Sequence, residues 1–420
     1  MLGVGRLGPL GGDMAPPARR VDDRERDAWV ILNEIEGVGP VTFERLIGAF
    51  GTARAVLDAA CAPGGPGRLV SACVDGDSGV RRLPWDTARA IADAAADPSP
   101  ILVPVRHSGV GVLVLADDAY PSRLRRIGLP PPVLYVRGSV AALDRPRAVA
   151  IVGTRRPTEV GRGTAGRIAD AVAGLGATVV SGLALGVDAA AHAAAVRGGH
   201  PTLAVIGGGH DRLYPASHRG LVQRIVETGG AVISEFAPET TPTRGTFPRR
   251  NRIISGLADA TVVVEAGARS GALTTAAWAL EQGRTLHVVP GRMDDPSVAG
   301  SLAFVREAGA EVHLVVGIPE LLEDLELAGE PAPPPPRRGS LPALARPAFA
   351  TPGAVLASLP PVERAIAAAI ARGSTSVDEL VAATDLGGAT VLGALTALEI
   401  RGLVLETFGR YRAAGPLAAA

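Results

Sequence analysis

Arginine is concentrated in two short segments of the chain, and both could bind an anion. Residues 244–252 contain four arginines and no acidic residue, and residues 153–167 contain four arginines and one glutamate. The guanidinium group stays charged and can contact phosphate through two parallel hydrogen bonds. The residues are Arg244, Arg249, Arg250 and Arg252 in the first segment and Arg155, Arg156, Arg162 and Arg167 in the second. We therefore expect a local phosphate-binding surface, although the formal net charge of the chain is +0.

The first arginine segment also indicates where a helix begins. Arg249-Arg250-Asn251-Arg252 leads directly into the apolar pair Ile253-Ile254, as a helix N-terminus does. Positive charge near a helix N-terminus opposes the helix dipole and lowers stability unless an anion lies nearby. The sequence thus predicts an anion beside this helix.

Three carboxylates that follow apolar segments offer a different chemistry. Acid–base catalysis could use Asp188 together with Glu235 or Glu265. Each residue also has a structural interpretation, because Asp188 before an Ala-rich segment suits a helix N-cap and loop amides can hold a buried glutamate. His192, one turn beyond Asp188, is expected to be packed rather than catalytic. Catalysis stays open as an alternative.

The composition excludes several classes of enzyme. The chain contains no lysine, which removes the Walker A phosphate loop, the kinase strand lysine, Schiff-base lysines and lysine-adenylating ligases. Two cysteines, Cys61 and Cys73, and seven scattered histidines match no metal-binding spacing. The glycine string Gly161–Gly166 begins several residues beyond the strand predicted to end at Gly153, so it does not suit a dinucleotide site. We expect no metal and no redox cofactor.

Short apolar runs separated by helical segments recur about every 25 to 30 residues in the middle of the chain. They lie at Ala148–Gly153, Thr178–Gly182, Leu203–Gly207, Ala231–Glu235, Thr261–Ala266 and Leu286–Gly291. Continuously apolar strands alternating with helices predict a doubly wound, mostly parallel α/β sheet covered on both faces. The polar and Gly-rich loops that follow the strands must meet at the carboxyl edge of that sheet, where such folds bind ligands.

The remaining regions suggest five parts in the chain. We expect a disordered tail over 1–21, a helical domain over 22–105, the α/β domain over 106–328, a Pro-rich linker over 329–353 and a small helical unit with a hairpin over 354–413. Met14 is a candidate start alongside Met1. No signal peptide is predicted, because the Gly- and Pro-rich segment Met1–Pro17 has no basic-then-apolar order. No membrane span is predicted, because glycines interrupt the uncharged stretch Ala171–Val187. We expect a soluble cytoplasmic protein.

Several motifs together resemble the DNA-processing protein DprA (Smf) family. They occur in the family's order over about Tyr120 to Ala310. They are Ile151-Val152-Gly153-Thr154-Arg155, Ser181-Gly182-Leu183-Ala184-Leu185-Gly186-Val187-Asp188 with His192, Tyr214-Pro215, Ser234-Glu235, Phe247-Pro248-Arg249-Arg250-Asn251-Arg252, Ser270-Gly271-Ala272-Leu273-Thr274-Thr275 and Pro290-Gly291. Upstream, Tyr120-Pro121-Ser122-Arg123-Leu124 and Leu134-Tyr135 followed by Gly138 are similar to the start of the family's fold.

The resemblance implies an extended Rossmann-like domain in a non-enzymatic, cytoplasmic homodimer. Such a protein binds single-stranded DNA, loads the recombinase RecA and protects DNA taken up during natural transformation. The family's motifs, together with the arginine clusters, give the predicted DNA-binding residues. They are Arg155, Arg156, Ser181, Gly182, Arg249, Arg250, Asn251, Arg252, Ser270 and Gly271. With few aromatic residues in the chain, we expect binding to rely on phosphates rather than on base stacking.

The match to the family has departures, and the flanking regions carry weaker motifs. Ala216 stands where the family often has lysine, and the segment after Pro290-Gly291 matches loosely. Ile35-Glu36-Gly37-Val38-Gly39 resembles a helix-hairpin-helix turn of a helical (SAM-like) domain, and residues 377–412 resemble a winged helix. The second helix of this winged helix, within 389–400, contains no basic residue, Asn or Gln, so we expect it to read DNA bases poorly. We give a role of this domain in protein contact or regulation at least the same weight as a role in DNA binding.

Two other functions remain open from the residues alone. A nucleotide phosphoribohydrolase of the related lysine-decarboxylase-like Rossmann group would use Glu265 or Glu235 as its catalytic carboxylate. That group bears Pro-Gly-Gly-x-Gly-Thr, whereas the comparable loop here reads Ala268-Arg269-Ser270-Gly271-Ala272-Leu273-Thr274-Thr275. A nucleotide sensor without DNA affinity is the other alternative.

Overall fold

The computed structural model describes residues 21–72, 83–327, 356–357, 359–388, 390–391, 394–395, 398, 403–407, 410–413 and 417. The chain divides into two compact units, 1–331 and 332–420. The predicted tail over 1–21 and the predicted linker over 329–353 lie almost wholly outside the described residues. The five-part division of the chain stays a prediction.

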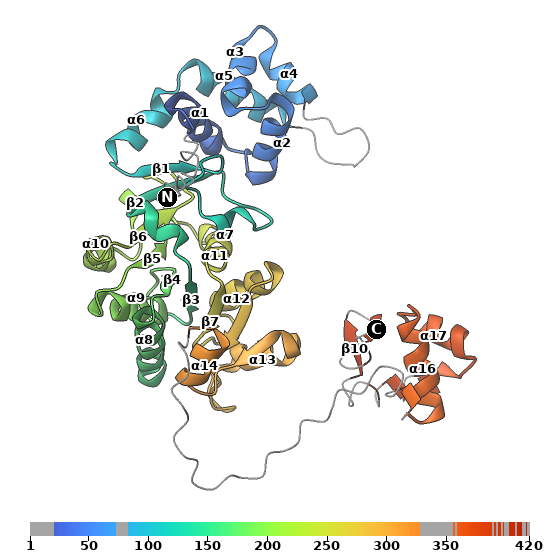
Figure 1. The fold of residues 1–420 in the computed structure, drawn as a ribbon. Helices are drawn as coiled ribbons and strands as arrows, with labels where there is room; N and C mark the ends of the chain where they lie inside the picture. The colour runs from blue at the N-terminus through green and yellow to red at the C-terminus, as the bar shows by residue number, and fades with distance from the viewer. Residues whose placement is uncertain are drawn as a thin grey trace, which may run out of the picture. The chain divides into compact units, whose positions relative to one another are not determined.

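The first unit begins with a group of helices that packs against one edge of a sheet (Figure 1). They are α1 (Asp23–Glu34), α2 (Pro40–Phe50), α3 (Ala53–Cys61), α4 (Gly65–Ala72), α5 (Trp85–Ala96) and α6 (Ser99–His107). Their apolar core continues into strand residues Val114, Val133 and Tyr135. The Tyr135 hydroxyl donates a 2.8 Å hydrogen bond to Oε1 of Glu34 in α1. Helices and sheet therefore share one core.

A nine-stranded sheet forms the centre of the first unit. The strands are β1 (Gly111–Val114), β2 (Val133–Gly138), β3 (Ala148–Val152), β4 (Thr178–Ser181), β5 (Thr202–Val205), β6 (Ala231–Ser234), β7 (Ala260–Val263), β8 (Thr285–Val288) and β9 (Val312–Leu314). Their order is β1-β2-β6-β5-β4-β3-β7-β8-β9, and every pair from β6 to β9 is parallel. β1 and β2 are antiparallel to their neighbours. The predicted doubly wound, mostly parallel sheet is confirmed.

Helices in the connections between the strands cover the sheet. They are α7 (Ser122–Arg125), α8 (Glu159–Gly174), α9 (Val187–Arg197), α10 (Arg219–Glu227), α11 (Thr246–Gly256), α12 (Ala272–Glu281), α13 (Ala299–Ala308) and α14 (Ile318–Asp324). α8 to α10 connect β3 to β6 in steps along one direction, whereas the connection through α11 returns to β7 on the other side of β3. The strand order therefore reverses between β3 and β7, which is where open α/β sheets place their ligand crevice.

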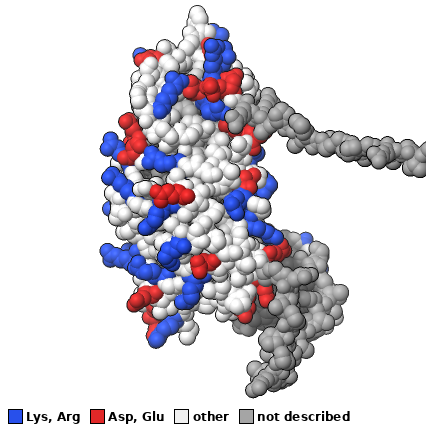
Figure 2. All heavy atoms as spheres, turned by 60° about the vertical axis from the view of Figure 1, so that its left-hand side comes forward, with Lys and Arg blue, Asp and Glu red and all other residues white. Residues whose placement is uncertain are grey.

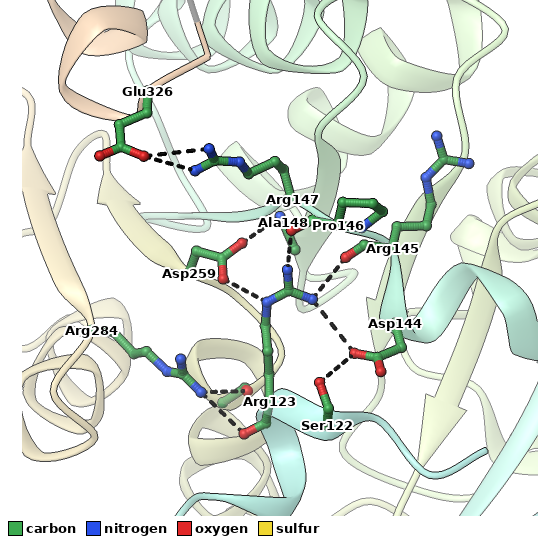
Figure 3. Close-up of polar contacts among 11 residues, drawn as sticks. Ser122, Arg123, Asp144, Arg145, Pro146, Arg147, Ala148, Asp259, Arg284 and Glu326 are labelled. Atoms are coloured by element: carbon green, nitrogen blue, oxygen red, sulfur yellow. Dashed lines mark hydrogen bonds and ion pairs between the residues drawn. The ribbon is translucent and has the colours of Figure 1, made fainter. Parts of the chain in front are cut away.

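The motif Tyr120–Leu124 fastens α7 to the amino edge of the sheet (Figure 3). The Arg123 guanidinium is buried, with Nε 2.6 Å from Oδ1 of Asp259 and with Nη1 and Nη2 donating to the carbonyls of Arg145 and Pro146. Asp259 in turn accepts from the amide of Ala148, the first residue of β3. This motif is therefore part of the framework and lies away from the strand-end loops.

The second unit contains α16 (Pro361–Ala371), α17 (Val377–Thr384) and a hairpin of β10 (Val404–Thr407) and β11 (Arg410–Ala413). α17 begins with a capping box, in which Ser376 and Glu379 satisfy each other's backbone amides. Most of the predicted second helix over 389–400 lies outside the described residues.

Candidate nucleic-acid interface

A cavity of about 930 Å³ opens at the carboxyl edge of the sheet. The loops after β3, β4, β5, β6 and β7 line it, together with residues of α9, α11 and α12. We call it the strand-end pocket. It lies where the strand order reverses, so the fold places the predicted loops together as expected.

Four exposed arginines line the pocket from three different loops. Arg155 and Arg156 come from the loop after β3, Arg244 precedes α11, and Arg269 precedes α12. Asp188 is the one acidic residue of the pocket lining among the described residues, and it is buried. The pocket surface therefore carries a strong positive charge.

Helix N-termini add to this positive potential. The first turn of α11 lines the pocket, and Ser270 and Gly271 stand just before α12. The amide of Ala272, the first residue of α12, donates a 3.3 Å hydrogen bond to the Ser270 hydroxyl, and Gly271 is the N-cap residue. The unpaired amides of a helix N-terminus attract anions. The predicted residues Ser270 and Gly271 thus sit where an anion is favoured.

Two aromatic side chains meet at the pocket. Tyr214, 55% exposed, and Phe247 form an edge-to-face pair with ring centroids 5.9 Å apart. The guanidinium of Arg155 lies over the Phe247 ring at 5.2 Å. The expectation that base stacking plays little part therefore overlooked these rings, because low aromatic content says nothing about where the few rings gather.

Arg250 lies at the base of the pocket with its guanidinium turned inward. Nη1 donates to the carbonyl of Gly182 at 2.6 Å and to that of Val205. Burial lowers the pKa of Arg250 to about 10, with Asp188 acting in the opposite direction. Arg250 stays charged at neutral pH and holds together the carboxyl ends of β4 and β5.

Arg252 points away from the pocket and is paired with an acid of the protein itself. Its Nη2 lies 2.8 Å from Oε2 of Glu235, and both side chains are almost fully buried. Arg249 is half-exposed, with Nε 3.2 Å from the same oxygen. Neither Arg249 nor Arg252 belongs to the pocket lining. The anion predicted beside this helix is thus partly supplied by Glu235.

Asn251, Ser181 and Gly182 mainly support the loops. Asn251 lines the pocket and its Nδ2 donates a 3.0 Å hydrogen bond to the carbonyl of Gly271. The buried Ser181 hydroxyl donates to the Ile151 carbonyl, and the Gly182 amide donates to Asp188. Ser181 and Gly182 are not part of the pocket lining.

The carboxylates considered for catalysis are bound within the framework. Glu265 accepts from the amide and hydroxyl of Thr158, at 2.9 and 2.5 Å, beneath the first turn of α8. Neither Glu235 nor Glu265 lines the pocket. The N-cap interpretation of Asp188 is wrong: Asp188 is the second residue of α9 and accepts from the amides of Gly182 and Ala184, because the preceding loop turns back over it. Burial raises the pKa of Asp188, and Arg250 acts against this shift.

Comparison with known proteins assigns the chain to a family. A model described as DNA recombination-mediator protein A matches residues 111–326, about half of the chain. The chain belongs to the DNA recombination-mediator protein A (DprA) family. The DprA winged helix domain matches residues 350–409, and the DprA-like N-terminal HHH domain matches residues 23–65.

Two curated relatives and one solved structure are similar to this chain over most of their own length. A putative DNA processing protein DprA of Mycobacterium tuberculosis is 38% identical over 339 residues, which cover 77% of this chain and 82% of the relative. Protein Smf of Synechocystis is 32% identical over 414 residues, covering 92% and 98%. The X-ray structure of DprA from Streptococcus pneumoniae matches with a TM-score of 0.59 and 27% identity, covering 71% of this chain and 97% of that one.

The family assignment confirms the flanking motifs identified from the sequence. The turn Ile35–Gly39 joins α1 to α2, and Gly37 has a φ of +88°, a conformation that favours glycine. A Cβ on Gly37 would also approach Oγ1 of Thr87 to 2.5 Å.

Within the described residues, no helix has the length and apolar character needed to cross a bilayer.

Sequence reasoning did not single out four residues of the strand-end pocket as site members. Arg244 belonged to the arginine cluster, and Arg269 stood in a strand-end loop. Tyr214 and Phe247 stood inside two quoted motifs. Their position in, or directly after, the loops that follow strands was the available signal, and only the fold showed that the two rings face each other.

Proposed function

We propose that the strand-end pocket binds single-stranded DNA through its phosphates. The observation that carries this proposal is the set of exposed arginines Arg155, Arg156, Arg244 and Arg269 around one cavity. Each is free to form a bidentate contact with a phosphate group. The α11 and α12 N-termini add amide donors on the same side.

The Tyr214–Phe247 pair supports a preference for single strands over duplex. Unpaired bases expose their faces, and stacking on an aromatic ring tolerates any base. Arg155 over the Phe247 ring leaves a cation beside the place where a base would stack. A duplex offers phosphates to the same arginines but hides its base faces.

Arg250 and Arg252 have positioning roles in this proposal. Arg250 joins the carbonyls of Gly182 and Val205, and Arg252 neutralises Glu235 beneath α11. Both keep the exposed arginines in place without requiring contact with DNA. Arg249 shares features of the exposed arginines and of the positioning arginines, because its side chain is half-exposed and also pairs with Glu235.

The test is fluorescence anisotropy of a labelled oligothymidine, with duplex of equal length, at two salt concentrations. We expect preferential, salt-sensitive binding of the single strand, lost in the variant Arg155→Glu/Arg244→Glu. The matched control is Arg197→Glu/Arg224→Glu, two exposed arginines on α9 and α10 outside the pocket lining. Equal affinity of the two double variants would refute the site. Direct binding of a nucleoside monophosphate by a chain that binds no DNA would favour the sensor alternative.

The finer roles rest on the family resemblance. We propose that the chain acts in the cytoplasm as a homodimer that protects incoming single-stranded DNA and loads RecA onto it during natural transformation. The expected result is faster RecA filament formation on DNA covered by a single-strand-binding protein. Light scattering of the purified chain at twice the monomer mass supports the dimer. No acceleration of RecA at saturating DNA-bound protein would contradict the loading role.

A further inference from the structure

A second hollow lies beside α10. It has a volume of about 410 Å³ and runs between η2 (His210–Arg212), α10 and the sheet residues Arg137 and Val232. Leu213, Val222 and Val226 give it an apolar wall. We call it the α10 groove.

The α10 groove adjoins the strand-end pocket. Leu213 lines the groove, and the next residue, Tyr214, lines the pocket. Successive Cα atoms in a chain are about 3.8 Å apart. Consecutive residues of the chain therefore line the two hollows, and Tyr214, whose ring is exposed, is the pocket residue next to the groove in sequence.

The groove offers a cation in Arg219. Arg219, the first residue of α10, is exposed and forms no ion pair within the described part of the chain. The two acids of the groove have partners, since Asp211 lies 3.6 Å from Arg137 and Glu227 accepts from Gln223 at 2.8 Å. Figure 2 shows arginines, with fewer acids between them, on the face brought forward from the side of α8, α9 and α10.

The interior of the groove suits an uncharged ring. His210 Nε2 donates to the Tyr135 carbonyl at 3.0 Å, so Nδ1 is the remaining acceptor of the ring. Burial lowers the pKa of His210 to about 4, which keeps the imidazole neutral. An apolar wall, a neutral acceptor and a peripheral guanidinium together match the base and the phosphate of a nucleotide.

We propose that the α10 groove binds further nucleotides of the same single strand that occupies the strand-end pocket, beyond Tyr214. This inference rests on the proposed function. It predicts that the binding site is longer than the pocket and that the strand crosses the Tyr214 ring. The groove should contribute less than the pocket, because it offers one unpaired arginine and the pocket surface offers several.

The experiment compares two oligothymidines of about 4 and about 16 nucleotides, the range covered by known single-strand-binding folds. The variant Arg219→Glu should bind the long oligonucleotide about tenfold more weakly and the short one within about twofold of wild type, because only the long strand reaches the groove and meets the reversed charge. Arg224→Glu is the matched control: it is exposed on the same helix and outside the groove lining. It should bind both oligonucleotides within about twofold of wild type.

The outcomes separate the two proposals. If Arg219→Glu and Arg224→Glu have equal affinity for the long oligonucleotide, while Arg155→Glu/Arg244→Glu abolishes binding, the groove proposal is wrong and the pocket proposal stands. If the wild-type chain binds neither oligonucleotide, both are wrong. A loss on the long oligonucleotide confined to Arg219→Glu supports the groove.

Discussion

Glu235 and Arg252 form a nearly dry ion pair, with 2.8 Å between Oε2 and Nη2 and side-chain exposures of 2% and 4%. Arg249 reaches the same carboxylate but keeps 48% of its side chain exposed. Arg250, between them in sequence, turns instead to the carbonyl of Gly182. The sequence alone assigns residues 249–252 to one DNA-binding surface. In the fold, Arg250 and Arg252 are buried in the framework, and Arg249 stays half-exposed at the surface.

Removing Arg252 should destabilise the domain rather than specifically weaken DNA binding. Arg252→Ala breaks the buried ion pair and leaves Glu235 with the half-exposed Arg249 as its remaining cation among the described residues. Removing one partner of a buried ion pair typically costs about 3–5 kcal/mol of stability. Arg155→Ala, at an exposed position, should change stability by less than about 0.5 kcal/mol. Urea denaturation of both variants measures the difference. A variant Arg252→Ala as stable as wild type would contradict the structural role.

The exposed arginines should contribute to the salt dependence of single-stranded DNA binding. Each phosphate contact to a single strand contributes about 0.7 to the slope of log affinity against log salt. Arg155→Gln and Arg244→Gln should each make the slope shallower by about that amount with no change in melting temperature. Oligothymidine titrations at several salt concentrations measure it. An unchanged slope in both variants would exclude these two contacts.

Tyr214 should distinguish single strands from duplex. Tyr214→Ala removes an exposed ring whose stacking on a base is worth about 1–3 kcal/mol. We expect weaker single-strand binding, with duplex affinity and thermal stability close to wild type. Anisotropy with both DNA forms tests this prediction, and Tyr214→Phe should retain the preference. Equal losses for the two DNA forms would argue against stacking.

Two glycine substitutions should shift stability in opposite directions. A Cβ on Gly182 would lie 2.5 Å from Arg250 Nη1 and 2.7 Å from Asp188 Oδ2, so Gly182→Ala should destabilise by about 1–3 kcal/mol. Gly163, within α8, has only Arg167 Nη1 at 3.7 Å, so Gly163→Ala should stabilise by up to about 1 kcal/mol. Thermal denaturation measures both changes. Equal changes in melting temperature for the two variants would mean that the side chains of Arg250 and Asp188 move aside without cost when Gly182 gains a Cβ.

Buried histidines should make the protein less stable in mild acid. Burial lowers the pKa of His192 to about 3 and that of His210 and His287 to about 4, from 6.5. The unfolded chain binds these protons below pH 6.5 and the native chain does not, so stability falls as pH drops from 6.5 toward 4. Each histidine contributes about 1.4 kcal/mol per pH unit in that window.

The variant His287→Phe tests this assignment. Neither ring nitrogen of His287 has a hydrogen-bond partner in the described part of the chain, so the imidazole can be replaced without breaking a bond. Urea midpoints between pH 5 and pH 6.5 should then depend less steeply on pH than in wild type. An unchanged dependence would show that His287 titrates normally in the folded protein.

The sequence alone determined the sheet and the edge at which its strand-end loops gather. The apolar run Ala148–Gly153 became β3, Ala148–Val152, because strands buried on both faces must be apolar throughout. Alternation with helices made the strands parallel, so their carboxyl ends and the loops that follow had to share one edge. Local composition carries this information.

Only the tertiary structure decided which arginine faces the pocket. The direction of Arg252 depends on Glu235, 17 residues earlier on another element, and that of Arg250 on the ends of β4 and β5. The contact of Tyr214 with Phe247 likewise joins the loop after β5 to the first turn of α11. A charged side chain is buried or exposed according to partners that are distant in sequence, and composition cannot supply those partners.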